Sequence, residues 1–317
     1  MATKKETTPK KEVKEITESS VFSPYANIED NDMGCYRKHG YMSPYKCMRV
    51  QLGTERWYVD TKKDYSRGAT FLSDKIQSLV STDKFLDNWR ASMKRELQGD
   101  EGFDAWMGNV SDFGTLVHEL FGADVKTRIN EYHINDAVKA FAEKNKLTGQ
   151  TAYGAAMKAT KAILAFRKFV EEHELDILSM EEMVHSEELK TTTPIDIFGI
   201  GIYKGVKSYF LVNMKTSESE GEFHKWQCAI EYLCAMNTLP IHDLPVVVLT
   251  VQPKDWKLPS GATYHMTDYT NFATDPENQE TIRTISRVLI KNGAYDKPKK
   301  LYPALNESGY EILNAFI

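Results

Sequence analysis

The sequence predicts an α/β fold in which helices of the first half precede a mixed central sheet. Apolar residues recur every three or four positions from about residue 80 to residue 175, as in helices packed against a core. From about residue 179 to residue 255 apolar and polar residues alternate instead, which indicates strands. A helical segment interrupts these strands, and a helix between two strands allows them to run parallel. We therefore expect a mixed central sheet flanked by helices.

Length and composition indicate a single folded domain. The chain has 317 residues, of which 41% are hydrophobic and 27% are charged, as in globular proteins. Residues 1–20 are mostly Lys, Glu, Thr and Ser, so we expect a disordered tail. Residues 21–317 are expected to form one domain, with its helical part at about 80–175 and its sheet core at about 179–255.

The expected elements follow in order along the chain. Two short strand-like runs separated by Gly53-Thr54 predict a β-hairpin, Lys46–Leu52 with Glu55–Val59. Four helices follow, at Thr82–Leu97, from Phe113 onward with Gly114-Thr115 in the first turn, at Ile134–Lys146 and at Thr151–His173. The expected strands are Ser179–Ser186, Asp196–Tyr203, Ser208–Lys215 and Leu244–Gln252, with a crossover helix at Phe223–Met236 and a late helix at Thr281–Lys291.

Charge, cysteine content and hydropathy exclude several classes of protein. Lys plus Arg number 40 and Asp plus Glu number 45, so with a net charge of −5 any DNA site must be a local basic groove. Four cysteines do not make a disulfide framework in a chain of this length. No apolar run approaches the roughly 18 residues of a membrane span. We expect a cytoplasmic protein with no membrane partner.

Three polar residues mark one end of the predicted sheet. Residues two apart in a strand point to one face, so Asn213 and Lys215 project together, and Asp196 on the neighbouring strand can reach the same spot. A carboxylate, an amide oxygen and an ammonium group could hold a divalent ion and a phosphate oxygen. The alternative is a solvated hairpin whose polar residues face water.

The order of several motifs resembles a nuclease family. Gly114-Thr-Leu-Val-His118 is followed by Asp196, then by Asn213-Met-Lys215-Thr-Ser217, and then by Gln227 through Tyr232. This order is similar to that of the RecB-type exonuclease branch of the PD-(D/E)XK nuclease superfamily, close to mitochondrial genome maintenance exonucleases and related phage exonucleases. The resemblance covers about residues 65 to 255, and Arg67-Gly-Ala-Thr-Phe-Leu72 agrees with it in part. The resemblance implies a PD-(D/E)XK nuclease-like fold, and it suggests a phage origin and, with it, the cytoplasm of the host cell.

The resemblance also implies roles for individual residues. His118, Asp196 and Asn213 would bind Mg²⁺ or Mn²⁺, with Asp196, Asn213 and Lys215 acting in catalysis and Lys215 as the catalytic lysine. The residues that would contact DNA are Gln227, Tyr232, Thr216, Ser217 and Arg67. The implied activity is metal-dependent DNA exonuclease activity, releasing nucleotides from single-stranded ends. The expected partner is therefore DNA, single-stranded or at an end; the sequence does not identify a protein partner.

Two positions depart from the pattern of the family. Asn213 stands where the family has Asp or Glu, and a site with fewer carboxylates holds Mg²⁺ less tightly. Asn213 is either an engineered replacement of Asp, in which case restoring Asp should switch on cleavage, or the mark of a naturally weakened or inactive nuclease. Gln227 and Tyr232 are five residues apart, whereas the family spaces this pair by four, which keeps both on one helical face.

Several alternatives remain at this stage. His118 taken alone is more often a structural histidine, and a zinc-protease motif fails because Gly122 stands where its second histidine would be. Lys62, Lys63 and Arg67, with Trp57, Tyr58 and Tyr65 between them, form either a strip that binds a DNA strand or a solvated edge anchored by core aromatic residues. The rival functions are a catalytically silent DNA-binding or assembly protein and an endonuclease of the same superfamily.

Overall fold

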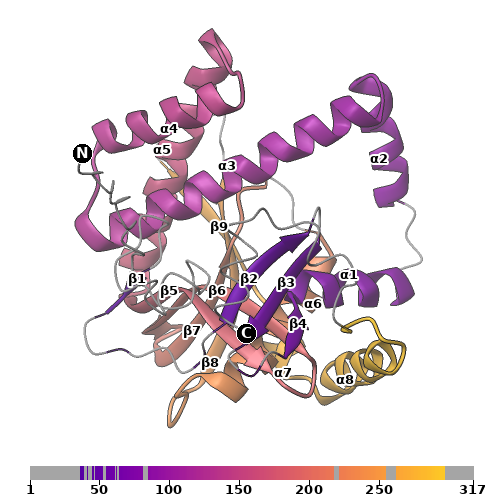
Figure 1. Ribbon diagram of the computed structural model, residues 1–317. Coiled ribbons are helices and arrows are strands. Elements are labelled where there is room, and N and C mark those ends of the chain that lie inside the picture. The colour runs from indigo at the N-terminus through magenta and orange to yellow at the C-terminus, as the bar shows by residue number, and fades with distance from the viewer. Residues whose placement is uncertain are drawn as a thin grey trace, which may run out of the picture.

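A computed structural model describes most of the predicted domain. It covers residues 36–38, 41, 45, 47–52, 55–60, 62, 64–80, 85–217, 221–254 and 262–296. The predicted tail of residues 1–20, the turn Gly53-Thr54, the helix start Thr82-Asp83 and Lys63 lie outside these described residues. Figure 1 shows a twisted sheet with helices packed around it.

The sheet contains nine strands within the described ranges. They are β1 Tyr36–Arg37, β2 Cys47–Leu52, β3 Glu55–Asp60, β4 Tyr65–Arg67, β5 Asp176–Ser186, β6 Thr191–Tyr203, β7 Val206–Met214, β8 Val246–Lys254 and β9 Thr263–Asp268. The order across the sheet is β2-β3-β4-β6-β7-β8-β9, and β5 pairs with β1 and β6. The β4–β6 and β7–β8 pairs are parallel and the other pairs are antiparallel. The expected mixed sheet is therefore confirmed.

The predicted hairpin of β2 and β3 is present, and β6 and β7 form a second hairpin. In the β2–β3 hairpin Leu52 pairs with Glu55, as expected for a two-residue connection. In the β6–β7 hairpin Tyr203 pairs with Val206, and the two turn residues between them, Lys204 and Gly205, both have positive φ, 49° and 79°. Positive φ at both central residues is the turn geometry that matches the twist of antiparallel strands.

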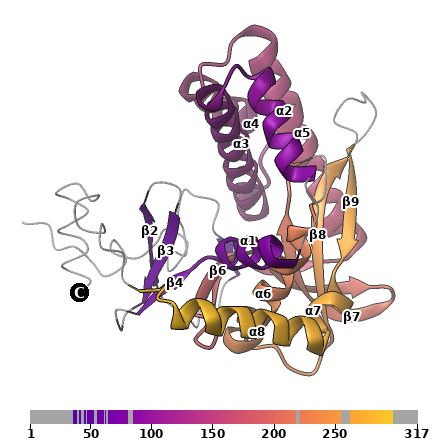
Figure 2. The same cartoon turned by 90° about the vertical axis from the view of Figure 1, so that its right-hand side faces the viewer.

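Helices cover both faces of the sheet. They are α1 Ala69–Val80, α2 Phe85–Glu96, α3 Asp100–Thr127, α4 Glu131–Lys144, α5 Gly149–Glu172, α6 Phe223–Thr238, α7 Thr270–Thr274 and α8 Pro276–Lys291. One buried cluster joins α3, α4 and α5 to Phe210, Val212 and Met214 of β7. The other joins α1, α6 and α8 to Leu211 of β7 and Val248 of β8. Figure 2 shows α2 to α5 standing together on one side, apart from α1, α6 and α8.

The predicted start of the helix at Phe113 is wrong. Helix α3 begins at Asp100, so Gly114 and Thr115 lie in its interior and not in its first turn. A glycine inside a helix costs about 1 kcal/mol of stability relative to alanine, so we expect a close contact there that requires a small residue. A Cβ atom at position 114 would lie 3.4 Å from Oγ1 of Thr216, which directly follows Lys215. The small residue thus lets α3 approach the chain just beyond β7.

The crossover from β7 through α6 to β8 matches the sequence-based expectation. Strands β7 and β8 run parallel, with Asn213 beside Thr250 in the register. The sequence patterns did not indicate α1, β1, β4, α7 or β9. Among the helices within the described ranges, none is both long enough and apolar enough to cross a lipid bilayer.

Candidate metal and catalytic site

The candidate site lies where the pairing of β6 and β7 ends. The last residue pair at this end of the ladder is Ile197 with Val212. One step further, the backbone N–H of Met214 donates to the side-chain Oδ2 of Asp196 at 2.6 Å, so a carboxylate takes the place of a backbone carbonyl. The side chain of Asp196 is only 10% exposed. Asp196 is therefore held rigidly at the fork between the strands.

Three potential metal ligands converge at this fork. Nδ1 of His118, on α3, lies 2.9 Å from Oε1 of Glu181 and 3.7 Å from Oδ1 of Asp196. One ligand atom from each residue lies within 4.8 Å of the other two. The predicted meeting of an imidazole from the helical half with Asp196 of the sheet is thus present, and Glu181 joins them.

Glu181 was missed by the sequence analysis. It lies on β5 between Met180, which pairs with Ile197, and Glu182, which pairs with Ile195, and so it stands across from Asp196. Its φ of 53° is in the left-handed region, which costs a non-glycine residue on the order of 1 kcal/mol. Its side chain is 8% exposed. The available signal was the pair of adjacent carboxylates, Glu181 and Glu182, in the strand that precedes the strand of Asp196.

The charges of the cluster are strongly coupled. Burial by itself would lower the pKa of His118, but the nearby carboxylates of Asp196 and Glu181 raise it to about 9. Burial raises the pKa of Asp196 to about 6, even though His118 and Lys215 favour its charged form. In the absence of a metal ion, a protonated imidazole therefore balances the carboxylates.

A second group of polar side chains joins the end of β7 to α6. The amide nitrogen of Asn213 donates to both carboxylate oxygens of Glu231, at 3.0 and 2.8 Å. Nε2 of Gln227 donates to Oε1 of Glu231 at 2.7 Å. Nζ of Lys215 donates to Oε1 of Gln227 at 3.3 Å. Asn213, Lys215 and Gln227 are therefore linked, and the predicted metal ligation by Asn213 stays a prediction.

Glu231 is the second residue that the sequence analysis missed. It is 5% exposed, and burial raises its pKa to about 7 against the opposing influence of Lys215. Gln227 and Glu231 are four residues apart on α6, so they lie on one helical face. The four-residue partner of Gln227 is thus Glu231, and not Tyr232, which the resemblance had implied.

The side chain of Tyr232 lies on a different face of α6 from that of Gln227. It lines a cavity of about 230 Å³ together with Leu189, Met236 and Arg283. Leu189 lies in the turn between β5 and β6, Met236 on α6 and Arg283 on α8. The five-residue spacing from Gln227 explains this, because a straight helix turns the two side chains away from each other. α6 is a continuous α-helix, so no local bulge brings the two side chains back to one face.

Arg67 packs against two aromatic rings. The carbon of its guanidinium group lies 4.2 Å from the ring centroid of Trp57 and 3.9 Å from that of Phe71, and its side chain is 8% exposed. This packing leaves little of the guanidinium group of Arg67 accessible to a DNA phosphate. Trp57 and Tyr58 are 3% and 1% exposed, so of the two alternatives for this segment the one with aromatic residues anchored in the core holds for these two side chains.

Thr216 and Ser217 extend the site toward the surface. Both follow β7 directly, Thr216 is half-buried beside α3 and Ser217 is exposed. Their contact with DNA stays a prediction, and their position near the surface is compatible with it.

The set of donor atoms suits a divalent cation. Two carboxylates lie close together in a largely buried place, where they repel each other and a positive charge between them is stabilising. Carboxylate oxygens suit Mg²⁺ and Mn²⁺, and an imidazole nitrogen makes the set softer than an all-oxygen one. His118, Glu181 and Asp196 therefore fit such an ion.

A comparison with protein-family models and one with curated proteins both found no match to this chain.

Proposed function

We propose that this protein is a metal-dependent DNA exonuclease with a PD-(D/E)XK-like site, which hydrolyses phosphodiester bonds from single-stranded ends. The observation that carries the proposal is the convergence of His118, Glu181 and Asp196 within 4.8 Å. Such a cluster alone is common in proteins. What favours hydrolysis is the neighbouring ammonium group of Lys215, whose charge acts on both His118 and Asp196.

His118, Glu181 and Asp196 would hold a Mg²⁺ or Mn²⁺ ion. The imidazole nitrogen makes the site better suited to Mn²⁺ than a purely carboxylate site would be. When bound, such an ion polarises a phosphate and lowers the pKa of a water molecule. The fixed position of Asp196, held by the backbone N–H of Met214, keeps one oxygen ready without reorganisation.

Lys215 would act on the phosphate itself. Its side chain is joined to Gln227 by a 3.3 Å hydrogen bond, which aims the ammonium group while leaving it other N–H donors. A fixed cation beside a phosphodiester stabilises the negative charge that develops during hydrolysis. Thr216 and Ser217 supply hydroxyl groups for the DNA backbone next to it.

The proposal is tested with the full-length chain, a labelled linear single strand and a closed circular single strand, each incubated with Mn²⁺. We expect degradation of the linear strand only. Asp196→Asn, Glu181→Gln and Lys215→Met should each lower the rate at least about 100-fold, since each removes a charge from the site. Glu143→Gln, on the exposed side of α4, is the matched control and should leave the rate unchanged.

The outcomes separate the rival functions. Cleavage of the circle would identify an endonuclease. If neither strand is cut with Mn²⁺ or Mg²⁺ at any pH from 7 to 9, the proposal of a nuclease fails.

A second candidate is a DNA-binding protein without catalytic activity. It is favoured by His118, whose raised pKa lets a protonated imidazole occupy the place between the two carboxylates without a metal ion. This candidate predicts salt-sensitive binding of single-stranded DNA that neither EDTA nor Mn²⁺ changes.

A further inference from the structure

The orientation of two amide side chains depends on one buried carboxylate. An ionised carboxylate only accepts hydrogen bonds, so an amide facing it must present its NH₂ group. Asn213 does so toward both oxygens of Glu231, at 3.0 and 2.8 Å, which turns its Oδ1 away from α6. Gln227 does so toward Oε1 of Glu231 at 2.7 Å, and its own oxygen accepts from Lys215. Glu231 thereby orients both amides.

We propose that Glu231 is the positioning residue of this site and that it forms a matched pair with Asn213, in which the helix carries the carboxylate and the strand carries the amide. The pair fixes Lys215 through Gln227, and the catalytic part of this inference rests on the proposed function. Asn213 is then a working residue of the site, and neither a replaced Asp nor a sign of decay.

The geometry makes an acidic residue at position 213 incompatible with Glu231. Asn213 is 4% exposed and Glu231 is 5% exposed, so neither side chain can turn into water. An Asp at position 213 would place two carboxyl groups about 3 Å apart, which would have to share a proton to avoid strong repulsion, and the amide donor of residue 213 would be lost. Restoring Asp, which the resemblance suggested as a gain of activity, should therefore cause a loss.

Moving the carboxylate from the helix to the strand should repair that loss. In the double variant Asn213→Asp with Glu231→Gln, the amide of residue 231 can donate to the carboxylate of residue 213. One buried carboxylate and one amide are again present. The total charge equals that of the natural chain, and the pair is only reversed in direction.

The experiment is a double-mutant cycle on the full-length protein. Its four members are the natural chain, Asn213→Asp, Glu231→Gln and the double variant, all at pH 8. Two quantities are measured: the melting temperature without metal, and the rate of Mn²⁺-dependent degradation of a linear single strand. Two exposed residues of α4 provide matched controls, Asn135→Asp and Glu143→Gln.

We expect Asn213→Asp to lower the melting temperature by about 5 °C, as for a loss of a few hydrogen bonds and a new repulsion in a protein of this size. We expect both single variants to lower the cleavage rate at least 10-fold, mainly through kcat, because Lys215 loses its fixed position. The double variant should return to within about 3-fold of the natural rate and recover the melting temperature, and the controls should change neither.

Each outcome decides one of the two proposals. If Asn213→Asp keeps its melting temperature and cleaves faster than the natural chain, the matched pair is refuted while the nuclease stands. If no member cleaves DNA but the melting temperatures show the loss and its recovery, the pair stands and the nuclease fails. Additive losses in the double variant for both quantities would also overturn the pair.

Discussion

Glu181 on β5 and Glu231 on α6 are buried carboxylates whose partners come from other elements of the fold. Their partners are far away in the chain: His118 for Glu181, and Asn213 for Glu231. Only the packing of α3 and α6 on the sheet brings these groups together.

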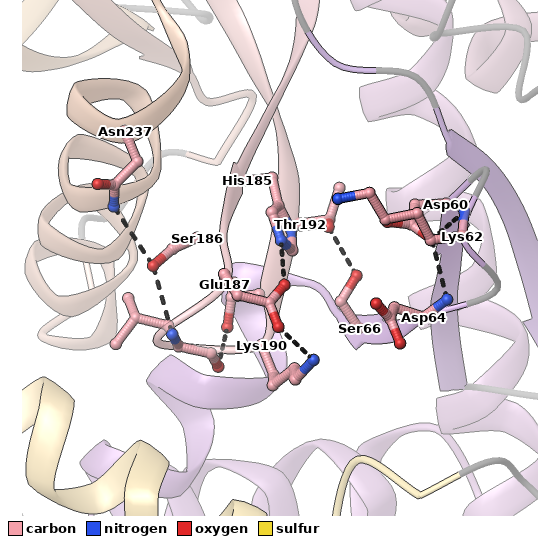
Figure 3. A network of polar contacts seen from close by, with 12 residues as sticks. Asp60, Lys62, Asp64, Ser66, His185, Ser186, Glu187, Lys190, Thr192 and Asn237 are labelled. Atoms are coloured by element: carbon pink, nitrogen blue, oxygen red, sulfur yellow. Dashed lines mark hydrogen bonds and ion pairs between the residues drawn. The ribbon is translucent and has the colours of Figure 1, made fainter.

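His185 provides a prediction for pH dependence. Figure 3 shows it within a polar network, with Nδ1 2.8 Å from Oγ1 of Thr192 and Nε2 3.3 Å from Glu187, and its ring stacks on Tyr45. Burial lowers its pKa below the usual 6.5 despite the opposing effect of Glu187. The unfolded chain therefore takes up a proton first, and the stability contributed by neutral His185 is lost as the pH falls below about 6.5.

We expect His185→Gln to cost about 1–2 kcal/mol at pH 7 and to lose less stability than the natural chain between pH 7 and pH 5. The measurement is urea unfolding at several pH values. His242→Gln, in the exposed segment before β8, is the control. Parallel pH profiles for the natural chain and His185→Gln would contradict the prediction.

At the scale of elements, the attachment of α3 to α5 determines where His118 stands. Asp124 of α3 is 4% exposed and accepts hydrogen bonds from Nε and Nη2 of Arg167 on α5. The same carboxylate accepts from the backbone N–H of Ile129 at 3.0 Å, and Arg167 also donates to the carbonyl of Ile129 at 2.6 Å. One ion pair thus holds the end of α3, the turn after it and the middle of α5.

Asp124→Asn should lower the free energy of unfolding by about 2–3 kcal/mol, because it removes the buried charge that accepts two hydrogen bonds from Arg167. The control is Asp112→Asn on the same helix, whose partner Lys144 has a side chain that is 69% exposed. An exposed pair contributes about 0–1 kcal/mol, so this variant should change little. Urea unfolding measures both, and equal losses would show that the clamp has no special role.

At the scale of the whole molecule, the helical half and the sheet share one core. Phe121 of α3, Phe166 and Phe169 of α5, and Phe210 and Val212 of β7 belong to a single buried cluster. Because this cluster spans both parts, the helices cannot detach without exposing the apolar face of the sheet. This arrangement favours the single domain that length and composition predicted.

We expect α3–α5 and β5–β8 to lose protection from hydrogen exchange at the same denaturant concentration, in one cooperative step. Phe169→Ala, at a side chain that is 0% exposed, should reduce the free energy of unfolding by about 3–5 kcal/mol. That common midpoint should fall accordingly. Val288→Ala, on the exposed side of α8, should leave it nearly unchanged. Earlier exchange of the helices would instead mean two separable units.

Local sequence patterns were enough to predict much of the secondary structure and several residues of the candidate site. The spacing of apolar residues sufficed for α4, α5, α6 and strands β5 to β8, because a helix or strand must bury one face whatever its neighbours are. His118, Asp196 and Lys215 were singled out by type and order along the chain. The tertiary structure alone decided that α3 starts at Asp100, that Arg67 and Trp57 are buried, and that Glu181 and Glu231 complete the site. These features depend on contacts between residues tens of positions apart, and such contacts leave no periodic trace in a single sequence.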